Sequence, residues 1–558
     1  MTTLRYFGPV KTAWWHSVVV WWCLVLGLSW AWDVSTTLQL PPRSIHQWRQ
    51  ADALSQTLNY FEGGMHFWEP AIHLQHGTGG KGAGEFPVLY YVNAWVWHAA
   101  ETPLPWTLRW TNALIWLAGL TALRWLIRKM TGSGLLGTTV AAFVFVSPLS
   151  AYYGPNYLVN ISALAFVFLG WAATSRWSAP SAPSGPSWLA ACAALSLAIL
   201  LRPTMAIGLI PLGWPFLAAI ARRPHPWGPR LTTLPGALLL AVPLLLGAAW
   251  VLWAQAYNAA SGSVYFLTTT RPLWATPDPG AVWHTFRTLR LPEVYHGYTL
   301  LTLLTLLLAA PALALVARLR PRTSAPPSAP APQTTPPSAH PGPSALLTAL
   351  ALLAYFALWF KNFREHDYYL IEVHLLTPWA MMILVPGLAS QQAGRWLVAC
   401  VFAGQTLHTT ATSALKLDPT PPTWIRPIVG NWAWHDAARF HAHHARHLEP
   451  LERLQPELES LGIGRDDWVL SLPDPSPNIT LTMLRRKGFT GLYEDHLQAG
   501  ARVQWAADQG ARFLVINRPE ILDSGDWGRA LDHPVAERGE TLIFEIGHLA
   551  APRSASPR

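Results

Sequence analysis

An arginine and an aspartate stand three residues apart in a polar stretch near the N-terminus, Ile45-His-Gln-Trp-Arg-Gln-Ala-Asp52. On a helix this spacing places Arg49 and Asp52 on one face. A carboxylate can act there as a general base, and a guanidinium can hold a phosphate or position the carboxylate. Glu85 stands at the start of the next apolar helix, so we expect it at the same depth in the membrane as Arg49 and Asp52. The alternative is a surface ion pair and a helix-capping glutamate without chemical function.

Two further polar groups interrupt apolar runs. Arg202 precedes Pro203, where a charge is costly unless it has a partner. The sequence Asn362-Phe-Arg-Glu-His-Asp-Tyr-Tyr369 opens a later apolar run. For Arg202 the alternative is a side chain that extends to the membrane interface without a function. For 362–369 the alternative is an ordinary interfacial belt of tyrosines and charges.

A glycine-rich segment, residues 77–84, contains Lys81 but lacks the Gly-Lys-Ser/Thr sequence of a P-loop. We interpret it as a loop, with Lys81 as a minor candidate for contact with a phosphate.

The elements that must position these residues are those of a membrane protein. Hydrophobic residues make up 51% of the chain and charged residues 12%, against about 25% charged residues in average domains. Many of the 32 tryptophans stand at the ends of apolar runs, where a membrane interface favours an indole. The net charge is +9, but the arginines punctuate apolar segments and form no stripe, which argues against nucleic-acid binding.

About eleven apolar runs are placed as helices that cross a bilayer, for which about 20 residues are needed. The run 188–201 is short, and Arg202-Pro203 separates it from 204–220. Lysines and arginines in the short loops then fall on one side, which predicts a cytoplasmic N-terminus and a C-terminal domain outside. Residues 86–100 are expected to form an interfacial helix, with a true membrane span as the alternative. The predicted spans lie near residues 14–32, 106–123, 134–150, 156–175, 188–201, 204–220, 233–254, 298–317, 345–360, 369–388 and 395–410.

Composition divides the chain into a transmembrane domain, 1–414, and a soluble domain, 415–558. The first outside loop is 33–105, with helices lying on the membrane. Segments rich in Pro, Ser and Ala at 178–187 and 322–344 are predicted cytoplasmic linkers.

In the soluble domain strands alternate with helices, which indicates a small α/β fold with a partly parallel sheet. The predicted fold class is therefore a polytopic α-helical membrane protein with a small C-terminal α/β domain. The predicted strands are 468–472, 512–516 and 541–546, and the predicted helices lie near 477–487 and 498–509.

The first-loop sequence His46-Gln-Trp-Arg-Gln-Ala-Asp52, together with Gly84-Glu-Phe-Pro87, resembles the GT-C superfamily of membrane glycosyltransferases. Within it, the chain is most similar to the bacterial branch related to protein O-mannosyltransferases and aminoarabinose transferase. Leu201-Arg-Pro-Thr204 resembles the Lys/Arg-Pro-Thr turn of that family, and 362–369 resembles its His-x-Tyr-Tyr motif.

The resemblance implies an inverting glycosyltransferase that moves a sugar from a polyprenyl-phosphate donor to an acceptor hydroxyl. It implies Asp52 as the catalytic residue, with Glu85 beside it. Four residues are expected to bind the donor phosphate, namely Arg49, Arg202, His366 and Arg364. Four others, Tyr368, Tyr369, Tyr90 and Lys81, are expected to line the sugar or lipid site.

One departure matters: aminoarabinose transferases carry Lys-Pro-Pro where this chain has Glu85-Phe-Pro87, which argues against transferring their donor. No cofactor is certain, although Asp52 with Glu85 can bind a divalent metal, as in some relatives. The expected partners are membrane lipid, the lipid-linked donor and an acceptor of unknown class. A composition rich in Ala, Arg and Pro is typical of high-GC bacteria, so we expect the inner membrane and a periplasmic site.

Two other functions compete with this interpretation. A transporter or flippase of lipid-linked sugars predicts charges in the middle of several spans. A membrane-anchored binding module leaves Arg49, Asp52 and Arg202 without a purpose.

Overall fold

The computed structural model describes residues 14–177, 184–214, 233–263, 265, 270–275, 278–290, 341–364, 366–492, 496–524, 527, 531 and 533–550. The predicted span 298–317 and most of the two predicted linkers lie outside these residues. The C-terminal ends of both predicted linkers lie in helices, since α9 begins at Ser184 and α14 at Gly342.

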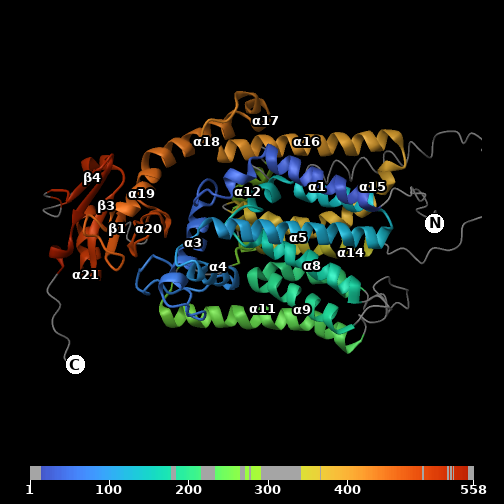
Figure 1. The fold of residues 1–558 in the computed structure, drawn as a ribbon, viewed down its shortest axis with the longest axis horizontal. Helices are drawn as coiled ribbons and strands as arrows, with labels where there is room; N and C mark the ends of the chain where they lie inside the picture. The colour runs from blue at the N-terminus through green and yellow to red at the C-terminus, as the bar shows by residue number, and fades with distance from the viewer. Residues whose placement is uncertain are drawn as a thin grey trace, which may run out of the picture.

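Long apolar helices lie side by side along the long axis of the molecule, and the C-terminal sheet lies beyond one end of them (Figure 1). Between the two lie α3 (Gln47–Glu62) and α4 (Val88–Ala99) of the first loop. The long helices are α1 (Trp14–Ala31), α5 (Trp106–Thr131), α6 (Gly134–Phe145), α8 (Asn160–Trp177), α9 (Ser184–Leu201), α11 (Leu234–Ser261), α14 (Gly342–Leu358), α15 (Thr377–Ala389) and α16 (Gln392–Leu417).

Shorter helices connect and flank this bundle. The α-helices among them are α2 (Val34–Thr37), α7 (Pro148–Tyr153), α12 (Pro279–Arg290), α17 (Arg426–Val429), α18 (Asn431–His443) and α19 (Glu449–Leu454). Three short 3-10 helices, Pro203–Leu209, Phe360–Arg364 and Asp367–Leu375, interrupt the apolar runs close to the predicted site residues.

The helices follow the predicted spans, but their number as spans is not confirmed. Among the described residues, one helix, Leu234–Ser261, is long and apolar enough to cross a membrane. A second candidate is Asp367–Leu375 with Thr377–Ala389, which bend by 54° at their junction. The other apolar helices of the described residues are shorter than 18 residues or carry more polar residues.

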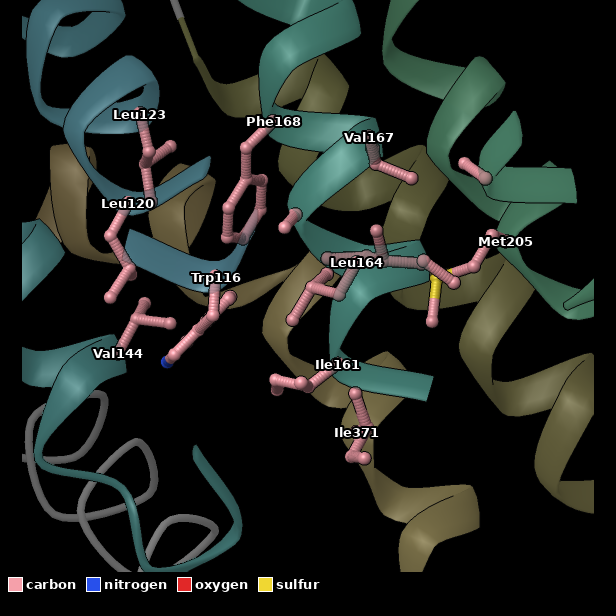
Figure 2. Close-up of a cluster of buried hydrophobic side chains, with 14 of the residues drawn as sticks. Trp116, Leu120, Leu123, Val144, Ile161, Leu164, Val167, Phe168, Met205 and Ile371 are labelled. Atoms are coloured by element: carbon pink, nitrogen blue, oxygen red, sulfur yellow. The ribbon is translucent and has the colours of Figure 1, made fainter. Parts of the chain in front are cut away.

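The core of the bundle forms where α5 and α8 meet, and Figure 2 shows Trp116, Leu120 and Phe168 there. The two helices approach closely at Gly119, where a Cβ would stand 2.6 Å from the Cα of Ala165. Met205 and Ile371 are buried in the same core. Met205 lies on the 3-10 helix that follows Arg202, and Ile371 lies on the 3-10 helix that contains Glu372. Core packing therefore anchors both segments that bring charge into the bundle.

The C-terminal domain contains a five-stranded sheet in the order β2-β1-β3-β5-β4. β1 (Trp468–Leu472) pairs in parallel with β2 (Gly488–Phe489) and β3 (Ala511–Ile516), while β5 (Thr541–Glu545) is antiparallel to β3 and β4 (Ala536–Arg538). The partly parallel α/β sheet is thus confirmed. The predicted helices correspond to α20 (Ile479–Leu484), shorter than expected, and α21 (Ala499–Gln509).

Candidate functional site

The first-loop helix α3 carries Arg49 and Asp52 on one face, as their spacing predicted. The helix begins after His46, whose backbone is left-handed with φ of 53°, and ends at Gly63. Most of α3 is buried although it is rich in polar residues, and Asp52 is only 3% exposed. A helix that buries a carboxylate in this way is typical of a site and not of a solvated surface.

Arg49 joins the two carboxylates that the sequence singled out. Its Nη2 donates to both oxygens of Glu85, at 2.9 and 2.8 Å, while Nη1 reaches Oδ2 of Asp52 at 3.4 Å. The hydroxyl of Tyr90 donates to Glu85 at 2.7 Å. Arg49 therefore positions carboxylates, and Glu85 with Tyr90 holds it in place.

The two carboxylate oxygens of Asp52 have different surroundings. Oδ2 accepts from Arg49 and, at 2.5 Å, from the hydroxyl of Tyr265. Oδ1 is buried and has no hydrogen-bond partner among the described residues. Burial raises the pKa of Asp52 to about 7, against the opposing field of Arg49 and the hydrogen bond from Tyr265. One oxygen is thus available to a substrate, on a group that titrates near neutral pH.

Glu85 behaves in the opposite way. Burial alone would raise its pKa, but the Arg49 guanidinium and the Tyr90 hydroxyl hold that pKa below its ordinary value. The two carboxylates therefore differ in protonation because their hydrogen-bond partners differ.

A second charged pair lies on the bundle side of the site. The Nε of Arg202 donates to Glu372, and the hydroxyl of Thr204 donates to the same carboxylate oxygen. Glu372 is 0% exposed and Arg202 7%. The guanidinium carbon of Arg202 lies 4.8 Å from the ring centre of Tyr369 and 5.8 Å from that of Tyr368. Nη2 of Arg202 is buried without a partner among the described residues, so this nitrogen is available to donate a hydrogen bond to a ligand.

Aromatic rings connect the two charged pairs. His366 stacks on Tyr368, with ring centres 5.3 Å apart, and lies 5.8 Å from Trp48, the neighbour of Arg49. His46 contacts Tyr368 edge-on, and its Nε2 lies 2.8 Å from Asp367. The His-x-Tyr-Tyr segment thus lies between α3 and Arg202.

Of the predicted site residues, Lys81 lies in other surroundings. Lys81 pairs with Glu69 at 3.7 Å, and both side chains are about half exposed. No contact of Lys81 with Asp52, Arg49 or Arg202 occurs in the described part of the chain. Arg364 ends the 3-10 helix Phe360–Arg364, and its side chain lies outside the described residues.

Sequence reasoning missed three residues of the site. Glu372 stands alone in an apolar run, and such a charge signals a buried partner. Asp367, which accepts from Tyr153 and pairs with His46, lies inside the motif already quoted. Tyr265 has no local signal, because it lies 213 residues from Asp52 in the sequence and meets it only in the folded chain.

The residues present do not fit a divalent metal at Asp52 and Glu85. Arg49 lies between the two carboxylates and binds both oxygens of Glu85, so a positive charge already fills that place. Over the residues that the structure describes, no group of three His, Cys, Asp or Glu side chains has the arrangement of a metal site.

Solved structures provide the comparison, since no family model and no curated protein matches the chain. ArnT from Cupriavidus metallidurans in the apo state is similar over 96% of this chain and 99% of its own, with a TM-score of 0.55 and 14% identity. The same protein bound to undecaprenyl phosphate gives equal coverage and TM-score at 13% identity. The apo oligosaccharyltransferase of Archaeoglobus fulgidus has a TM-score of 0.45 and 11% identity, over 88% of this chain and 69% of its own. The likeness to ArnT shows that the chain has the GT-C fold that its first-loop and bundle motifs predicted.

Proposed function

We propose that the protein is an inverting glycosyltransferase. It moves a sugar from a polyprenyl-phosphate donor to an acceptor hydroxyl, at the outer face of a bacterial inner membrane. In this proposal the N-terminus is cytoplasmic, and the first loop and the C-terminal domain lie in the periplasm. The acceptor is a glycan, a lipid or a protein.

One observation carries the proposal: four segments far apart in the sequence meet around one place. They contribute Asp52 with Arg49, Glu85, Arg202, and the His366–Tyr369 segment. A buried base and a buried cation with a spare donor are the two groups that glycosyl transfer from a lipid phosphate requires.

In the reaction that we propose, Oδ1 of Asp52 takes the proton of the acceptor hydroxyl. The hydroxyl oxygen attacks the anomeric carbon as the bond from that carbon to the phosphate oxygen breaks. The phosphate oxygen keeps the electron pair, and Arg202 with His366 stabilises the charge that forms there. A single attack from the face opposite the leaving group inverts the anomeric carbon.

The structure suggests a change in the expected role of Arg49. Its guanidinium is occupied by Glu85 and Asp52, so we assign it to holding the base and assign the phosphate to Arg202. The ArnT structure bound to undecaprenyl phosphate supports a lipid phosphate as the leaving group.

The direct test uses the purified full-length chain in lipid nanodiscs. Undecaprenyl-phosphate-linked glucose, mannose and 4-amino-arabinose are supplied separately, with a bacterial cell-envelope extract as the source of acceptor. We expect release of undecaprenyl phosphate from at least one donor, with transfer of its sugar to an extract component. Release from none of the three, in protein that still binds undecaprenyl phosphate, contradicts the proposal.

A further inference from the structure

A segment of the first loop completes the sheet of the C-terminal domain. Leu74 forms a parallel bridge with Gly488 of β2. The N–H of Gln75 donates to the Gly488 carbonyl at 2.7 Å, and the Gly488 N–H donates to the His73 carbonyl at 3.0 Å. Ile72 and Leu74 belong to the same buried core as residues of β1 and α20. The loop and the domain therefore fold against each other as one unit.

Gly488 makes this junction possible. Its φ is +151°, and a Cβ at this position would lie 1.8 Å from the Val469 carbonyl oxygen. A side chain at this position would therefore collide with the backbone of β1, which favours glycine.

The same loop segment holds α3 through one pair of buried side chains. The His73 N–H donates to Oγ of Ser55 at 2.8 Å, and Oγ lies 2.7 Å from Nδ1 of His73. Burial, with the charges of Lys487, Arg485 and Arg486, lowers the pKa of His73 to about 3. The ring is therefore neutral, and its Nδ1 shares a hydrogen bond with the Ser55 hydroxyl. Ser55 follows Asp52 by one helical turn.

Two further contacts reach the helix from the domain itself. Arg485 pairs with Glu62, the last residue of α3, at 3.0 Å. Near the start of α3, the carbonyl of Ala51 accepts from Thr482 of α20 at 3.4 Å and from Asn478, which precedes α20, at 3.5 Å. The domain thus contacts α3 directly near its start and at its end, and it reaches the middle of the helix through His73 of the first loop.

We infer that the C-terminal domain is a positioning module, which holds α3 through the His73–Ser55 pair and so places Asp52. This inference rests on the proposed function. The titratable groups facing Asp52 are Arg49 of α3, Glu85 before α4, and Tyr265. None of them belongs to the C-terminal domain, so the domain acts on Asp52 by placing and enclosing it.

The test compares Ser55→Ala with Thr57→Val in the full-length protein. The Thr57 hydroxyl is also buried on α3, but its hydrogen bond goes to Ala53 within the helix. For Ser55→Ala we expect kcat to fall about tenfold or more, with the KM for the donor unchanged. The midpoint of the acid limb of the pH–rate profile should move down by about one unit, because water reaches Asp52. Thr57→Val should keep both values.

A second pair of variants approaches the contact from the domain side. Arg485→Gln breaks the pair with Glu62, whereas Arg465→Gln breaks the pair with Glu459 inside the domain. We expect Arg485→Gln to lower the midpoint of the acid limb and Arg465→Gln to leave that midpoint unchanged. Both variants should keep the wild-type melting temperature. The inference is overturned if both Ser55→Ala and Arg485→Gln keep the wild-type kcat and the wild-type midpoint of the acid limb. It is also overturned if these variants lose activity by the same factor at every pH. Such results leave the proposed function standing if Asp52→Asn is still inactive.

Discussion

Arg49 gives Glu85 two short hydrogen bonds, although Asp52 is the carboxylate on its own helix. Asp52 receives only a 3.4 Å contact from the same guanidinium. One carboxylate is therefore held ionised, while the other remains free to take up a proton. Such a division of two neighbouring carboxylates is a general way for an enzyme to keep one of them as a base.

The first prediction concerns pH. A general base must be deprotonated to act, and burial raises the pKa of Asp52 to about 7. Transfer should therefore be weak at pH 5, rise through pH 7 and reach a plateau above it. The measurement is kcat/KM for donor from pH 5 to 9. An acid limb with its midpoint near 4 contradicts the assigned environment of Asp52.

Glu85→Gln should move that limb. The negative charge of Glu85 helps to raise the pKa of Asp52, and its loss leaves Arg49 free to approach Asp52. We expect a lower midpoint and, because a weaker base results, a kcat reduced by about tenfold. Glu69→Gln is the control, since Glu69 pairs with Lys81 at the surface. An unchanged midpoint in Glu85→Gln would show that Arg49 does not couple the two carboxylates.

The Arg202–Glu372 pair should control binding of the lipid phosphate. Arg202→Gln removes the buried cation, and we expect the Kd for undecaprenyl phosphate to rise about 30-fold or more. Glu372→Gln keeps the cation but loosens its placement, so a smaller increase should follow. Arg176→Gln, which alters an exposed arginine of α8, is the control. Equal affinity in Arg202→Gln and the wild type would exclude Arg202 from the phosphate site.

Gly488→Ala should destabilise the C-terminal domain. The added methyl group meets the β1 backbone, which cannot yield as a flexible side chain would. We expect Tm to fall by about 5 °C or more. Gly464→Ala is the matched control, because its Cβ would meet only the Asp467 side chain, at 3.4 Å. Similar melting curves for the two variants would mean that the sheet edge differs from the one described.

Local patterns were sufficient for several parts of the structure. The three-residue spacing predicted the Arg49–Asp52 pair, and strand-helix alternation predicted the strands at 468–472, 512–516 and 541–546 with small shifts. Both depend on contacts or periodicities within a few residues. The resemblance added Arg202, whose turn packs into the core beside Ile371.

Other parts depend on contacts between distant segments, which no local pattern reports. Gly488 reads as a loop residue until β1 and segment 73–75 flank it. Hydropathy also joins residues 369–388 into one run, although the backbone bends by 54° between Leu375 and Thr377. The partner of Arg202 could have been sought in that run, since Glu372 is the charge within it.

The role of Asp52 is tested most directly by Asp52→Asn in the purified protein, assayed for release of undecaprenyl phosphate from the donor that the wild type uses. Asparagine keeps the size and the contacts near Tyr265 but cannot take the acceptor proton. We predict a loss of kcat of about 1,000-fold or more, with the affinity for undecaprenyl phosphate and the melting temperature unchanged. Asp418→Asn, at the end of α16, should have wild-type activity. Full activity in Asp52→Asn would contradict the mechanism.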